Sequence, residues 1–241
     1  ANAVEFVLKS PEATNVQKIL VSSGSSGAQL WDLRLEPSAS NSIKSRLQFR
    51  LAIAATGTDL DVSTAQISMS TDYHNFRNGR PWNVLLQRKS GNDAASPQEY
   101  QLAVAEQIGD KINTLQVISK SVSSTNGNKN WYNTGSRHPD SGSNLVIGLT
   151  YTGSLAELRT WKSALSMSAF KQHVFDKKST VGNYAFASKD ELIYHYKLNE
   201  NWLSGSLNAK IKDSNIKNIK DYSLNIPSNA FGSGSSSIVK F

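Results

Sequence analysis

The chain has 241 residues, no cysteine, and 26 Lys and Arg against 19 Asp and Glu, for a formal net charge of +7. The lack of cysteine excludes disulfides and cysteine-ligated metal sites. The basic residues are scattered among acidic ones without a run of five, which is typical of a solvated surface and disfavours a nucleic-acid partner. No apolar run approaches the roughly 18 residues that a membrane span requires.

Short runs of alternating apolar and polar residues follow one another along the chain. In the clearest run, residues 46–54, Leu47, Phe49 and Leu51 alternate with Arg46, Gln48 and Arg50. Such alternation predicts a strand with one face on a core. Comparable runs cover residues 4–8, 17–23, 28–35, 65–69, 82–89, 99–107, 112–119, 144–149 and 192–198. About ten strands separated by Gly, Ser, Asn, Asp and Pro clusters predict an all-β sandwich or barrel rather than βαβ units.

One short helix is expected within Ser163–Phe175. Met167, Phe170 and Val174 form one apolar stripe at helical spacing there. Ser166 is a suitable N-cap residue. We expect this helix to cover one edge of the sheets, with its aromatic residue in the core.

Two polar segments are expected to form long loops. Residues 121–143 are almost wholly polar apart from Trp131 and Tyr132, and residues 70–81 carry Tyr73 and Arg77. Long loops in compact domains often carry function.

The C-terminal part divides into two further segments. We expect one domain over residues 1–187, and then a closing strand or the start of a following repeat over residues 188–226. Residues 227–241 are rich in Gly and Ser and indicate a connection. The chain begins without methionine, and its start has the look of either a fragment or a processed end.

The order of these pieces resembles the laminin-G-like, concanavalin A-like jelly-roll family. Trp82 precedes a strand that ends in Arg88 and Lys89, and a Tyr-x-Leu-x-Val strand runs from Tyr100 to Val104. The most specific block is Gly153–Ser166, "GSLAELRTWKSALS". The resemblance covers about residues 5–175, and it implies a two-sheet antiparallel jelly-roll sandwich with one short helix.

The second half also resembles virion structural proteins of tailed bacteriophages of marine bacteria. The similarity lies in "LAELRTWKSALS", "FKQHVFDKKS", "ELIYHYKLNENW" and "IKDYSLNIP". It implies a place in a virion, with other virion proteins as partners in a symmetric assembly.

Glycosidases of this fold need two carboxylates on one strand face, roughly 5–5.5 Å apart for retention. Glu157 has no acidic residue two or four positions away; the nearest carboxylate pairs elsewhere are Asp59 with Asp61 and Asp190 with Glu191. Alternation would place Glu157 on one face with Leu155 and Trp161. We therefore expect Glu157 and Arg159 to bond each other or neighbouring strands, and the chain not to be an enzyme.

No cofactor or metal is expected. The four histidines are isolated and show no zinc spacing, and no Gly-x-Ser-x-Gly elbow or phosphate-binding loop is present. Calcium is disfavoured because "TDLDV" supplies only Asp59 and Asp61.

Binding remains the favoured class of function. Sugar sites combine an aromatic face with Asn, Asp and Arg hydrogen bonds from loops. The two loops supply those residue types in Trp131, Tyr132, Asn133, Arg137, His138, Asp140, Tyr73 and Arg77. These residues are candidates for contact with a carbohydrate or a partner protein; alternatively, Trp131 and Tyr132 only anchor their loop on the sheet.

The sequence thus predicts a non-enzymatic virion module that docks other particle proteins or contacts host-surface carbohydrate. A carbohydrate-binding module of a secreted bacterial protein is the main alternative, and a glycosidase with atypical residues is a third.

Overall fold

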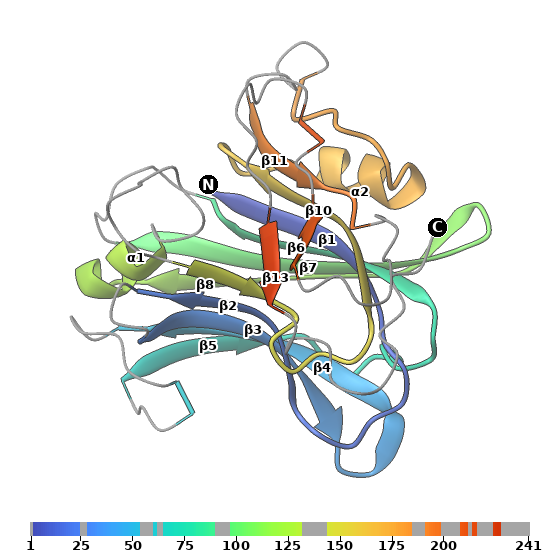
Figure 1. Ribbon diagram of the computed structural model, residues 1–241, viewed down its shortest axis with the longest axis horizontal. Helices are drawn as coiled ribbons and strands as arrows, with labels where there is room; N and C mark the ends of the chain where they lie inside the picture. The colour runs from blue at the N-terminus through green and yellow to red at the C-terminus, as the bar shows by residue number, and fades with distance from the viewer. Residues whose placement is uncertain are drawn as a thin grey trace.

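A computed structural model describes residues 2–24, 28–53, 60–61, 65–89, 97–131, 144–184, 191–198, 208–211, 214–215 and 224–227. Two antiparallel sheets pack face to face (Figure 1). The six-stranded sheet has the order β11 (Leu192–Tyr196), β10 (Ser154–Trp161), β1 (Ala3–Lys9), β6 (Pro81–Arg88), β7 (Gln98–Ile108) and β8 (Lys111–Val122). The five-stranded sheet has the order β5 (Gln66–Ser70), β4 (Asn41–Ala52), β3 (Gln29–Ser38), β2 (Gln17–Ser23) and β9 (Asn144–Ile147). The expected all-β, two-sheet antiparallel sandwich is confirmed.

The main core lies between the two sheets and is built by alternate residues of their strands. Val4, Phe6 and Leu8 of β1 face it, as do Leu47 and Phe49 of β4. This is the period-two pattern that the sequence shows, because successive side chains of a strand point to opposite faces of its sheet. Burial of these two inner faces is what holds the sheets together.

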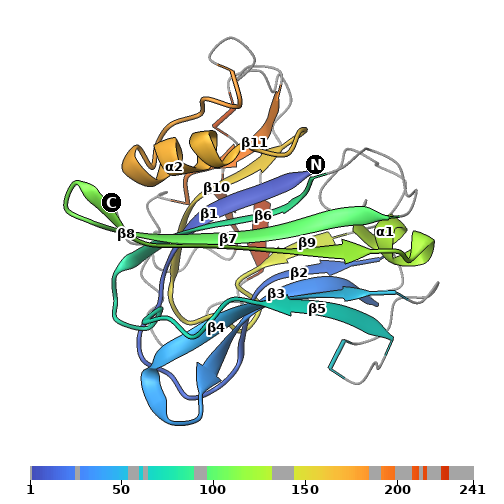
Figure 2. The same ribbon diagram turned by 180° about the vertical axis from the view of Figure 1, so that it is seen from behind.

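A second, smaller core lies on the other side of the six-stranded sheet, under helix α2 (Met167–Phe175). Phe170 and Val174 of the helix pack there with Leu85 and Trp161. Figures 1 and 2 show α2 on the face of this sheet that is turned away from β2–β5. The predicted cap is confirmed, because the Ser166 hydroxyl accepts a hydrogen bond of 3.1 Å from the backbone N–H of Ala169.

A second helix corrects the expectation of a single one. The segment expected as a loop at 121–143 begins with the end of β8 and continues into α1 (Thr125–Trp131). The Ser124 hydroxyl accepts a 3.0 Å hydrogen bond from Gly127 N–H at the start of α1. The expected loop at 70–81 is confirmed between β5 and β6.

The C-terminal part supplies β11, which pairs with β10 at an edge of the six-stranded sheet. It also contains β12 (Asn208–Ile211) and β13 (Leu224–Pro227), which pair with each other. Within the described residues, none of the helices has the length and apolar character that crossing a membrane demands.

Candidate functional site

The Glu157–Arg159 pair lies on β10, where the strand is irregular. Arg159 pairs with Glu5 and Ala156 pairs with Val7, so Glu157 and Leu158 together lie opposite one residue of β1. Glu157 has a φ of 53°, in the left-handed region that a non-glycine residue seldom adopts. Two residues opposite one is a β-bulge, which turns the following side chains to the other face.

The bulge makes the predicted face assignment for this strand wrong. Leu155 packs against the core between the sheets, whereas Trp161 belongs to the core under α2. Strict alternation would have put both side chains on one face, but the extra residue shifts the pattern by one position. The shift directs Arg159 and Trp161 together toward β1 and α2.

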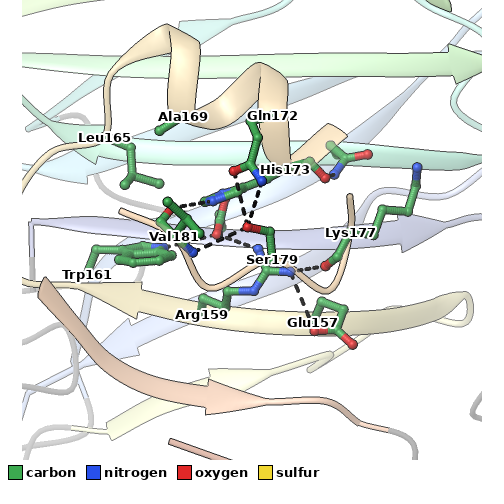
Figure 3. A network of polar contacts seen from close by, with 12 residues as sticks. Glu157, Arg159, Trp161, Leu165, Ala169, Gln172, His173, Lys177, Ser179 and Val181 are labelled. Atoms are coloured by element: carbon green, nitrogen blue, oxygen red, sulfur yellow. Dashed lines mark hydrogen bonds and ion pairs between the residues drawn. The ribbon is translucent and has the colours of Figure 1, made fainter. Parts of the chain in front are cut away.

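Arg159 links two carboxylates inside the protein, and Figure 3 shows its contact with Glu157. Its NH1 group donates a 2.7 Å hydrogen bond to Glu5 Oε1, and its NH2 group lies 3.5 Å from Glu157 Oε2. The same NH2 group donates to the backbone carbonyl of Lys177, beyond the end of α2. Glu5 and Arg159 are only 3% and 2% exposed.

A histidine extends the network at each carboxylate. His173 of α2 contacts Glu5 Oε2 through Nδ1 at 2.9 Å and lies stacked on Trp161. His195 of β11 contacts Glu157 Oε2 through Nε2 at 2.6 Å. We call Glu5, Glu157, Arg159, His173 and His195 the buried charge network. It joins β1, β10, β11 and α2, and it confirms that Glu157 and Arg159 bond each other and neighbouring strands.

The charges around both carboxyl groups hold them ionised. Burial opposes ionisation of Glu5, but Arg159 and His173 outweigh it and keep its pKa below the ordinary value of 4.5. Burial likewise opposes ionisation of Glu157, and hydrogen bonding and charge from His195 and Arg159 lower its pKa. A general acid needs a raised pKa and access to substrate. These properties favour a structural role for the pair over acid–base catalysis.

The described part of the chain contains no group of three or more His, Cys, Asp or Glu placed to hold a metal ion. Of the two aspartates considered for calcium, Asp59 lies outside the described residues. Asp61 is paired with Lys18 and Arg50.

Most predicted site residues of the 121–143 segment, namely Tyr132, Asn133, Arg137, His138 and Asp140, lie outside the described residues. Trp131 is described, and it is fully buried at 0% exposure. Its ring stacks on Trp31 with centroids 5.4 Å apart and meets Tyr100 edge-on at 5.5 Å. Trp131 therefore fits the anchoring alternative, because its ring is enclosed in the core and does not offer a face to a ligand.

The two predicted residues of the 71–80 loop differ in exposure. Arg77 is 1% exposed and donates to Ser45 Oγ at 2.6 Å and to the Asn15 carbonyl at 2.9 Å, so it ties the loop to the sandwich. Tyr73 is 44% exposed, and the Arg46 guanidinium lies 5.4 Å from its ring centroid. Among the described candidates, Tyr73 is the one that the structure leaves at the surface.

The neighbourhood of Tyr73 is a polar surface that the sequence analysis did not propose as a site. It is the outer face of the five-stranded sheet, and we call it the polar sheet face. Its members are Lys18 of β2, Asp32, Arg34 and Glu36 of β3, and Arg46, Gln48 and Arg50 of β4.

The side chains of the polar sheet face pair across strands. Asp32 lies opposite Arg50, Arg34 opposite Gln48, and Glu36 opposite Arg46. Each pair is also a side-chain contact: Arg50 Nε donates to Asp32 at 2.9 Å, Arg34 Nε to Gln48 at 2.8 Å, and Arg46 Nε to Glu36 at 2.7 Å. The signal was present in the sequence, because Asp-x-Arg-x-Glu and Arg-x-Gln-x-Arg are complementary when the strands run antiparallel.

Asp61 lies on this face, although it comes from the connection between β4 and β5. It forms ion pairs with Lys18 and with Arg50, the latter at 3.0 Å. Burial opposes its ionisation, but hydrogen bonds from Lys18 and Arg50 outweigh burial and lower its pKa. In turn, burial opposes the charged form of Arg50, while Asp32 and Asp61 raise its pKa.

This face combines guanidinium, amide and carboxylate groups that pair with one another, and Asp32 and Arg50 are only 0% and 3% exposed. Beside Arg46 it carries the exposed ring of Tyr73. Aromatic rings with neighbouring hydrogen-bonding groups recognise ligands that have an apolar face and polar edges, as sugars do. A scan against protein-family models finds no match for this chain, and searches of the curated proteins and of the solved structures find none either.

Proposed function

We propose that the chain is a non-enzymatic interaction module that binds carbohydrate through the polar sheet face and Tyr73. The observation that carries the proposal is the pairing of the 44% exposed Tyr73 ring with Arg46 at the end of an ordered set of charged and amide side chains. An exposed tyrosine held by a guanidinium is already oriented, so binding costs little side-chain entropy.

A second feature supports binding rather than hydrolysis. Arg159 contacts both Glu5 and Glu157. Both carboxyl groups are buried, ionised and bonded to basic side chains. Glycoside hydrolysis needs one protonated and one ionised carboxyl group at the sugar. We therefore assign the buried charge network to the stability of the sandwich.

The biological setting that we propose is a virion of a tailed bacteriophage, where the module contacts host-surface carbohydrate. Docking to other virion proteins is the second candidate function. Exposed apolar side chains along β8 favour it: Leu115 is 37% and Val117 39% exposed, on the last strand of the six-stranded sheet. Edge strands with exposed apolar residues are sites where another chain can pack.

A glycan array tests the carbohydrate proposal. We expect the wild-type chain to bind a subset of glycans and Tyr73→Ala to lose at least about tenfold in affinity, as expected when a stacking ring is removed. Tyr184→Ala is the matched control, because Tyr184 is 73% exposed in a different part of the chain. Absence of glycan binding, or equal losses in both variants, would remove carbohydrate from the proposal. Capture of virion proteins that Leu115→Ser abolishes would then favour docking.

A further inference from the structure

The Asp61 carboxylate lies where cations from three neighbouring strands converge. It is paired with Lys18 of β2, lies 3.0 Å from Arg50 NH2 of β4, and lies 3.6 Å from Arg34 NH1 of β3. We call Lys18, Arg34 and Arg50 the three-cation site. Oxyanions are held best by several charged donors acting together, and guanidinium groups supply directed ones.

The exposure of these side chains shows which of them faces solvent. Asp61 is 45% exposed, whereas the side chains of Arg50, Lys18 and Arg34 are only 4%, 13% and 17% exposed. The carboxylate therefore lies on the solvent side of the cations. Arg50 NH1 also donates a 2.7 Å hydrogen bond to the backbone carbonyl of the buried Leu60.

The charges on the polar sheet face explain why an acidic group is needed there. The face itself carries four cations, Lys18, Arg34, Arg46 and Arg50, against two carboxylates, Asp32 and Glu36. Arg50 uses Asp32, while Arg34 and Arg46 share Glu36. The strands thus leave a positive surplus, and Asp61, which is not part of any strand, neutralises part of it.

We propose that the three-cation site receives a sulfate or carboxylate group of an acidic polysaccharide, and that Asp61 occupies this position in the unliganded protein. The proposal rests on the carbohydrate-binding function proposed above and names the chemical class of the ligand. Because Asp61 competes for the same cations, it lowers the affinity for the ligand and restricts binding to polymers with enough acidic groups to displace it.

The position of Tyr73 favours a polysaccharide over an acidic peptide. Arg50 and Arg46 are four residues apart on β4, which places the three-cation site and the Tyr73–Arg46 pair about 13 Å from each other along the strand. Gln48 and Ser68 supply neutral hydrogen-bonding groups beside this path. An aromatic ring at one end and an anion site at the other suit a chain of several sugar rings.

The test measures the affinity of the whole chain for dextran sulfate, with neutral dextran as the uncharged match and polygalacturonate as the carboxylate source. We expect Asp61→Asn to bind dextran sulfate or polygalacturonate about tenfold more tightly than the wild type, because the competing carboxylate is gone. The polymer whose affinity rises in the Asp61→Asn variant identifies the acidic group, sulfate or carboxylate, that the site receives. Asp110→Asn is the control: it makes the same charge change in the turn between β7 and β8, and its affinity should change less than about twofold.

Adding Lys18→Gln to the Asp61→Asn variant should reverse the gain. An equal rise in affinity for Asp61→Asn and Asp110→Asn would show that the polymer is attracted by net charge alone, and this would overturn the site. A gain for polyglutamate without a gain for either polysaccharide would overturn the ligand class. If glycan binding depends on Tyr73 but is unchanged by Asp61→Asn, the three-cation site is refuted while the proposed function stands. If no variant binds any glycan, both proposals are refuted.

Discussion

Replacement of Arg159 by methionine should destabilise the protein more than the loss of any surface ion pair. Methionine keeps much of the side-chain volume but leaves Glu5 and Glu157 without the cation that lies between them. Loss of one partner from a buried ion pair typically costs about 3–5 kcal/mol, because the remaining charge stays buried and unpaired. His173 and His195 remain beside the two carboxylates, so we expect the lower end, about 3 kcal/mol.

Urea unfolding followed by tryptophan fluorescence measures this loss. With a slope of about 2–3 kcal/mol/M, the midpoint of Arg159→Met should fall by about 1 M or more. Lys89→Met is the control, since Lys89 and Glu99 lie 3.6 Å apart with side chains 45% and 44% exposed, and such pairs contribute at most about 1 kcal/mol. Arg159→Lys should lie between the two, because an ammonium group keeps the charge but not the forked geometry. Equal midpoints for Arg159→Met and Lys89→Met would refute the stabilising role of the buried charge network.

Two further outcomes follow from the structure. The fold lowers the pKa of Glu157 below 4.5, so its ionised form contributes stability above that pH, and the contribution is lost as pH falls through the folded value. The gap in urea midpoint between wild type and Glu157→Gln should therefore shrink as pH is lowered below 4.5, and a constant gap would contradict this account. Gly153→Ala would place its Cβ 2.2 Å from the Tyr151 hydroxyl and 2.4 Å from the Lys9 carbonyl oxygen, so we expect the free energy of unfolding to fall by about 2–3 kcal/mol. Gly24→Ala is the control, because its Cβ would meet Leu30 at 3.8 Å, and its melting temperature should be nearly unchanged.

The sandwich was predictable because its strands repeat a local signal. Leu47, Phe49 and Leu51 alternate with polar residues over one strand, and the core uses that alternation directly. The cap of α2 was predictable for a similar reason, since Ser166 and the apolar stripe lie within one short stretch. Helix α1 was missed because "TNGNKNW" has no apolar stripe and contains Gly and Asn. Its stability comes from tertiary burial of Trp131, which local propensity does not report.

The buried charge network was only partly predictable, because it depends on contacts between distant parts of the chain. The sequence places Glu157 beside Arg159, and it indicates that the pair is structural. It does not indicate that Glu5 and His195 complete the network, since those residues are brought together by strand order. The bulge at Glu157 has no signature in the alternating pattern, and this is why the face assignment of Trp161 was wrong.

The most direct test of the proposed binding face is a hydrogen-exchange footprint, recorded with and without the glycan that gives the strongest array signal. Our account predicts slower exchange in peptides from β3, β4 and residues 71–80, because the ligand lies across the outer face of the five-stranded sheet beside Tyr73. Protection confined to β8, or unchanged exchange throughout β3 and β4, would contradict it.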